Sequence, residues 1–409
     1  MRPLPALLAA LAVGAAALQP PLPAADEMET IRRLEAELRA APGHGGLLFR
    51  LARERALAGD AEGALRDLRE AIATGLDLDI ETESAFRLFS HRPEFMELLD
   101  RALDQRVVAR TSTVAFRVAE PDLIPEGLAH DPVTGDFFLG SVHKRKIVRV
   151  GADGKVRDFA TSGQDGLSEV LGLKVDPERR LLWAMSAGGK ADGPREGWSA
   201  AFVYDLASGQ LRRRYPLDDA PGKHLLNDLA LAAGGRAFLT DSASGAVWRV
   251  DPGAETPAPL VPAGRLDYPN GIALSGDERR LYVADFASGI SIVDPATGRV
   301  QPLPHPANVS LHGVDGLYWH PSGLVAVQNG AGTERVVRFR LSPDGLRVVG
   351  LDVLESRNPL FAIPTTGAIV GADFYFIANS LLDRLGPDGR LKPNPRLEEV
   401  VVLKAPLGR

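Results

Sequence analysis

The spacing of apolar residues changes once along the chain, near residue 110. Before this point the apolar positions follow helical spacing, as in "LLFRLARERALAGDAEGALRDLREAIATGLD" at residues 47–77. Gly59 and Asp60 divide this stretch into two predicted antiparallel helices, and residues 83–103 predict a further helix pair. After residue 110, runs of five to seven residues alternate apolar and polar positions between Gly, Asp and Pro turns, which predicts β-strands.

The helical segment, residues 27–107, resembles a single tetratricopeptide unit. Gly59 stands at the turn between the helices, and Ala64 and Ala71 stand at small packing positions. One such unit cannot bury its apolar face alone, so we expect it to pack on neighbouring helices or on the following domain. A docking site for a protein partner is a further expectation for these helices.

The β region repeats a unit made of a polar residue, a Gly or Asp, an apolar strand, a turn and further strands. We call the first position of each unit its lead position; these positions are Glu126, Leu171, Asn227, Asn270, Asp315 and Thr366. Their spacing of 43 to 56 residues is that of four-stranded propeller blades. The sequence therefore predicts an all-β six-bladed β-propeller over residues 110–409, behind a small N-terminal α-helical domain. Residues 111–120 and 397–407 are both expected in the last blade.

Composition and the N-terminus limit the classes of function. The chain has 409 residues, and its formal net charge of −6 gives no basic surface for nucleic acid. It has no cysteine, which excludes disulfides and thiolate chemistry. Arg2 precedes an apolar stretch over residues 7–18, too short to span a bilayer, and small residues follow. Residues 1–25 therefore predict a secretory signal peptide, with a retained membrane anchor as the alternative, and a periplasmic or secreted protein without a membrane span.

The lead positions carry the candidate chemistry. Because inner strands line the channel of a propeller, equivalent residues at their starts should form a ring at one face. Four lead positions carry side-chain oxygens, and they are Glu126, Asn227, Asn270 and Asp315. Oxygen donors with two carboxylates suit a hard divalent cation, with calcium as the first choice and magnesium, manganese or zinc as alternatives. The competing interpretation is that pairs such as Asn270-Gly271 only form turns before each strand.

The motifs "PEGLAHD", "LLNDLAL", "YPNGIAL" and "GVDGLYW" resemble the inner-strand motifs of the senescence marker protein (regucalcin)/gluconolactonase family. They are also similar to those of the paraoxonase and diisopropylfluorophosphatase propellers. The resemblance covers residues 112 to 405 and implies a catalytic divalent ion, usually calcium, on the same four side chains. Three positions depart from these families: Leu225 replaces the sugar-binding Arg of the gluconolactonases, Leu171 the catalytic His of the paraoxonases, and Thr366 a His of the diisopropylfluorophosphatases. The substrate is therefore left open.

A divalent ion at such a ring would polarise the carbonyl of a small-molecule lactone or ester. Asp315 is a candidate acceptor for the proton of the attacking water, and His224 and His312, each three residues before a lead position, are candidate general bases. The predicted function is a gluconolactonase-like, metal-dependent hydrolase of lactones or related esters. The alternative is a non-catalytic propeller that binds ligands or partners. The Gly-rich segment 186–200 is a candidate lid over the site.

Overall fold

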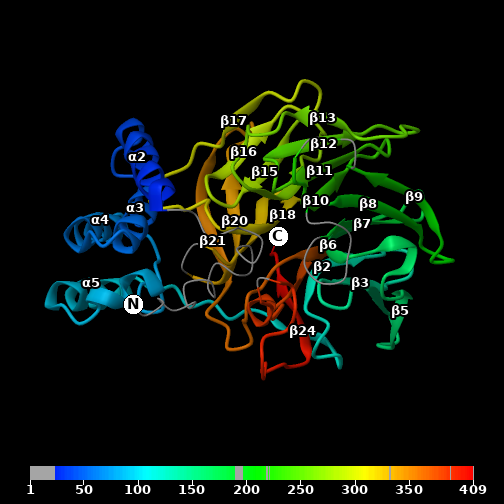
Figure 1. Cartoon of the computed structure of the whole chain (residues 1–409), viewed down its shortest axis with the longest axis horizontal. Coiled ribbons are helices and arrows are strands. Elements are labelled where there is room, and N and C mark those ends of the chain that lie inside the picture. Colours follow the sequence, from blue (N-terminus) through cyan, green and yellow to red (C-terminus); the bar gives the residue numbers. More distant parts are fainter. Residues whose placement is uncertain are drawn as a thin grey trace.

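The computed structural model describes residues 24–188, 197–217, 220, 222–330, 333–386 and 388–408. Figure 1 shows a β-propeller with helices packed against one side of it. The predicted signal segment lies almost entirely outside the described residues, as does the middle of the candidate lid. The predicted fold class, a six-bladed propeller preceded by helices, is confirmed.

Six antiparallel sheets of four strands form the blades. The first three blades are β2 (Pro125–His130), β3 (Phe137–Ser141), β4 (Ile147–Val150) and β5 (Val156–Ala160); β6 (Glu169–Asp176), β7 (Leu181–Ala187), β8 (Ser199–Asp205) and β9 (Leu211–Pro216); and β10 (Leu226–Leu231), β11 (Ala237–Asp241), β12 (Ala246–Val250) and β13 (Ala258–Val261). The next two are β14 (Pro269–Leu274), β15 (Leu281–Asp285), β16 (Gly289–Val293) and β17 (Val300–Pro302), then β18 (Val314–His320), β19 (Gly323–Gln328), β20 (Arg335–Leu341) and β21 (Val348–Ser356).

The last blade joins the two ends of the propeller. It contains β22 (Gly367–Val370), β23 (Asp373–Ile377), β24 (Val400–Pro406) and β1 (Thr113–Val118), in the spatial order β1-β24-β23-β22. The strand from the beginning of the β region is the outermost one, and it pairs with β24 from Thr113 opposite Lys404 to Val118 opposite Val400. The ring is therefore closed by backbone hydrogen bonds between segments almost 300 residues apart.

The helices are α2 (Ala24–Ala40), α3 (Gly45–Leu57), α4 (Ala61–Ala73) and α5 (Pro93–Asp104). Gly59 has a φ of +85° at the turn between α3 and α4, and the Asp60 side chain caps α4 by accepting from the Gly63 backbone N–H at 2.9 Å. Of the second helix pair predicted over residues 83–103, only the second member is an α-helix. Residues Ser84–Phe89 form a short 3₁₀-helix, and Pro93 begins α5 because the residue before a proline avoids the helical region. No helix within the described ranges is long and apolar enough to cross a membrane.

The helical segment contacts loops of the fourth and fifth blades. Arg357, just after β21, forms two hydrogen bonds of 2.9 and 3.1 Å with the buried Asp77 carboxylate, which follows α4. The N-terminus of α3 is held where the Gly45 backbone N–H donates to Ala307 at 3.1 Å. These contacts agree with the expectation that a single helical unit packs on its neighbour.

The glycines after the lead positions allow the inner strands to approach each other closely. Gly271 lies inside β14 and lacks the positive φ of a turn glycine. A Cβ placed on Gly271 would overlap the Asp315 carbonyl oxygen of the next inner strand, and one on Gly127 would overlap the Leu171 carbonyl oxygen. Asn270-Gly271 is therefore not a turn, and the turn interpretation of this pair is wrong. The glycine is required by close packing around the channel.

Replacing Gly271 with Ala should destabilise the propeller strongly. The added methyl group would be forced against backbone atoms that cannot move without displacing β18, and we expect a loss of about 3 kcal/mol or more. Gly234→Ala is the matched control, because a Cβ there meets no atom within 4 Å. Thermal and urea unfolding of both variants would measure the difference. Equal stabilities for the two variants would contradict this packing.

Candidate functional site

The four oxygen-bearing lead positions lie at equivalent places on four inner strands. Glu126 is the second residue of β2, and Asn227, Asn270 and Asp315 are the second residues of β10, β14 and β18. In each of these strands the pairing register shifts just after the first residue, as between Pro269 and Ile272. Such a bulge leaves the lead residue and its follower outside the regular ladder and redirects their side chains. All four residues are only 3–5 % exposed.

Three of these four residues carry a buried oxygen without a hydrogen-bond partner within the described structure: Glu126 Oε2, Asn227 Oδ1 and Asn270 Oδ1. A buried acceptor without a partner costs about 1–3 kcal/mol, so one such atom is uncommon and three on equivalent strands call for an explanation. Oxygen acceptors that the protein leaves unused are what a hard cation coordinates.

The amide nitrogens of the two asparagines bind the protein, which directs their oxygens away from it. Asn227 Nδ2 donates to Ser242 Oγ at 2.9 Å, and Ser242 Oγ in turn donates to the Pro269 carbonyl at 2.6 Å. The Asn270 side chain is hydrogen-bonded to Asp315, whose Oδ2 also accepts from Asn329 Nδ2 at 2.6 Å. The ring side chains are therefore held in fixed orientations by neighbouring blades.

The electrostatics of the ring favour a bound cation. Burial raises the pKa of Glu126 well above its usual value, and the charges of Asp315 and Asp228 raise it further. Burial also raises the pKa of Asp315, to about 7, although hydrogen bonds from Asn329 and Asn270 act in the opposite direction. Within the described residues no group of three His, Cys, Asp or Glu side chains is placed to hold a metal. The ring fits a metal only as two carboxylates and two amide oxygens, a donor set that suits calcium.

The two predicted histidine bases are both engaged by the protein. His224 is buried with Nδ1 2.6 Å from Asp241 Oδ2 and Nε2 3.3 Å from the Ala220 carbonyl oxygen. His312 is buried with Nδ1 3.1 Å from the Ala287 carbonyl oxygen, and its ring lies against Gly46 of α3. Burial lowers the pKa of His312 well below its usual value. These contacts give His312 a role in the packing of the helical segment, and the role of His224 and His312 as general bases stays a prediction.

Three channel residues were missed from the sequence: Asp228, Lys174 and Asn329. Asp228 occupies the place that glycine takes after each of the five other lead positions, and this difference was the one available signal. Its Oδ2 is also buried without a partner among the described residues, and Lys174 Nζ lies 3.8 Å from its Oδ1. Asn329, at the end of β19, had no signal because its contact with Asp315 depends on the pairing of strands.

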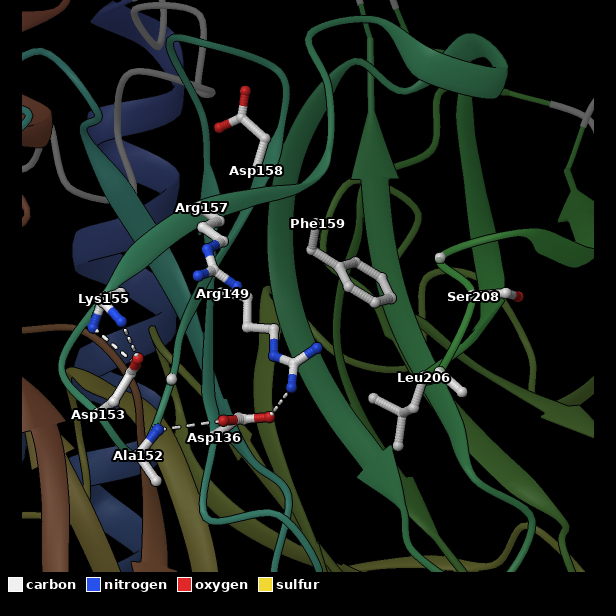
Figure 2. Close-up of a pocket in the computed structure, with 13 residues that line it drawn as sticks. Asp136, Arg149, Ala152, Asp153, Lys155, Arg157, Asp158, Phe159, Leu206 and Ser208 are labelled. Atoms are coloured by element: carbon white, nitrogen blue, oxygen red, sulfur yellow. Dashed lines mark hydrogen bonds and ion pairs between the residues drawn. The ribbon is translucent and has the colours of Figure 1, made fainter.

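A separate pocket lies between the β4–β5 turn and the β8–β9 turn (Figure 2). Its charged residues are largely paired with each other, as in the ion pairs of Arg149 with Asp136 and of Lys155 with Asp153. None of the ring residues lines it. This pocket therefore belongs to the outer part of the first two blades.

The raised pKa values predict how the stability of the metal-free protein depends on pH. A carboxyl whose pKa is higher in the folded state contributes stability that is present at low pH and lost as the pH rises through the folded value. Glu126→Gln mimics the protonated form. In the presence of a chelator it should therefore raise Tm by about 2 °C or more at pH 8, and the advantage should disappear near pH 4.

Added calcium at pH 8 should stabilise the wild type alone, so that the Tm of the wild type then exceeds that of Glu126→Gln. Glu97→Gln, at an exposed position of α5, is the control and should change Tm at neither pH. A Tm difference between Glu126→Gln and wild type that is the same at pH 4 and pH 8 would argue against the buried carboxyl pair.

Comparison of the sequence with protein-family models and with curated proteins finds no match. Solved structures are similar in fold. A putative glucose dehydrogenase from Thermus thermophilus is 17 % identical with a TM-score of 0.51, covering 72 % of this chain and 99 % of that one. The PQQ-bound aldose sugar dehydrogenase from Streptomyces coelicolor is 17 % identical with a TM-score of 0.50, covering 72 % and 98 %. A gluconolactonase from Xanthomonas campestris is 19 % identical with a TM-score of 0.47, covering 69 % and 86 %. At these identities the likeness shows the propeller fold alone.

Proposed function

We propose that this protein is an exported, divalent-metal-dependent hydrolase of lactones or related esters, with calcium as the metal. The observation that carries the proposal is the set of buried oxygens without partners on Glu126, Asn227 and Asn270, at equivalent positions of three inner strands. Asp315, on the next inner strand, adds the second carboxylate. Export rests on the apolar stretch that precedes small residues at the N-terminus of the sequence.

Glu126, Asn227, Asn270 and Asp315 would hold the metal, which when bound supplies Lewis-acid polarisation of the substrate carbonyl. The chain itself supplies orientation and a proton acceptor. Asn329 and Asn270 hold the Asp315 carboxylate in place, so that its oxygens can take a proton from a water that attacks the carbonyl. The four ring side chains are only 3–5 % exposed, and this low exposure strengthens their electrostatic interactions.

Three of the six residues that stand two positions before a lead position have large apolar side chains, and these three support an apolar substrate; the corresponding residue of β6 is Glu169. Ile124, Leu225 and Tyr268 are all buried, and they belong to one apolar cluster together with Leu171. Leu225 stands where the resembling family has a sugar-binding Arg. We therefore propose lactones or esters with apolar substituents as substrates, rather than sugar lactones.

The second candidate function is a propeller that binds a metal and a ligand without catalysis. One observation favours it: both nitrogens of His224 lie near protein acceptors, so this residue is not arranged as a general base. The two candidates share the metal ring and differ in turnover.

Calorimetric titration of calcium into the wild type, Asn270→Ala and Asp315→Ala tests the ring. We expect one calcium ion to bind to the wild type, and binding to be lost in both variants because each removes a ligand oxygen. Asn308→Ala, at an exposed loop position, is the control and should bind calcium normally. If none of calcium, magnesium, manganese and zinc binds to the wild type, the metal site does not exist.

Hydrolysis of an alkyl-substituted δ-lactone, with gluconolactone as the comparison, separates the two functions. The wild type with calcium should hydrolyse the alkyl lactone faster, and Asp315→Ala should reduce kcat/KM by about 100-fold or more. Metal binding without turnover of lactones or esters would favour the binding protein. Faster hydrolysis of gluconolactone would contradict the proposed substrate class.

A further inference from the structure

A lysine side chain lies in the channel beside the candidate metal ring. Lys174 is the third residue after the lead position of β6. The equivalent residues of the other inner strands are Ala129, Ala230, Ala273, Tyr318 and Ile369. Lys174 therefore stands where three other inner strands have alanine, a difference that the lead-position pattern alone did not indicate.

The Lys174 side chain reaches across the channel. Its Nζ lies 4.4 Å from the centre of the Tyr318 aromatic ring, and Tyr318 is on β18 of the opposite blade, with two blades between them in either direction. The Tyr318 hydroxyl accepts a hydrogen bond of 2.6 Å from the Gly367 backbone N–H, which fixes the ring in position. A cation over an aromatic face is attracted by the negative charge of the ring face.

The same ammonium group also faces the carboxylates of the site. It is 3.8 Å from Asp228 Oδ1, and Asp228 is buried directly after the ring residue Asn227. Asp228 Oδ1 accepts from the Leu229 backbone N–H at 2.8 Å, whereas Oδ2 has no partner within the described residues. The channel thus holds three carboxylates, Glu126, Asp315 and Asp228, beside one ammonium group.

We propose that Lys174 is a built-in countercharge that stabilises the metal-free ring and thereby limits its affinity for the divalent ion. This inference rests on the metal site of the proposed function. In the empty protein the ammonium offsets the repulsion among the carboxylates. When the ion binds, the ammonium repels it, so that binding stays weak enough to be reversible. Lys174 is a positioning residue in this scheme and takes no part in the reaction.

Calcium calorimetry at pH 8 tests the proposal with two variants, one that removes a positive charge and one that removes a negative charge. Lys174→Met removes the positive charge and should tighten calcium binding by about tenfold, because a unit charge several ångströms from a divalent ion repels it at an effective dielectric constant of about 20. Asp228→Asn removes a negative charge and should weaken binding by about the same factor. Lys174→Arg keeps the charge and should bind as the wild type does.

Thermal unfolding in chelator gives the second measurement. Lys174→Met should lower the Tm of the metal-free protein and gain more Tm from saturating calcium than the wild type gains. Equal or weaker calcium binding by Lys174→Met would overturn the role of Lys174 and leave the metal ring standing. Absence of calcium binding by the wild type would overturn the proposed function together with this inference. If Lys174→Met does not fold, Asp228→Asn decides: tighter or unchanged binding overturns the proposal.

Discussion

The close approach of the inner strands around the channel is the constraint on which the rest of the structure depends. Backbone atoms of neighbouring inner strands come so near that a single methyl group on Gly127 or Gly271 would overlap a carbonyl oxygen of the next strand. This packing brings residues of four blades together although they are separated by 40 to 190 residues in sequence. The bulge at the start of each of these strands then frees the lead residue from the ladder.

Burying the polar side chains of the ring lowers the stability of the fold, and the close packing of the inner strands keeps them buried. Three oxygens without partners, on Glu126, Asn227 and Asn270, and two carboxylates with raised pKa values are unfavourable in a buried place. Ser242 and Asn329 hold the ring side chains in position but leave those oxygens free. Side chains that are held rigidly while their oxygens lack hydrogen-bond partners are expected of a preorganised binding site.

The helical segment packs against the propeller through one residue, His312, that the sequence suggested for catalysis. His312 lies three residues before Asp315, yet its ring packs against the start of α3. His44, the N-cap of α3, lies with Nε2 3.0 Å from Nε2 of His305, in the loop that leads towards the fifth inner strand. The closeness of His312 to Asp315 in sequence therefore did not show where its side chain points, because a loop residue can face either the channel or a neighbouring element.

The sequence alone determined the number of blades, the order of helices and strands, and the four oxygen-bearing lead positions, because each is a periodic feature that local spacing reveals. It left open whether Asn270-Gly271 is a turn, which strand closes the last blade, and where His224 and His312 point. Only the tertiary structure decided these points. The glycine requirement comes from the Asp315 carbonyl of another strand, and the partners of Lys174 come from two other blades. Contacts between segments so distant in the chain have no local signature, since they depend on how the blades close into a ring.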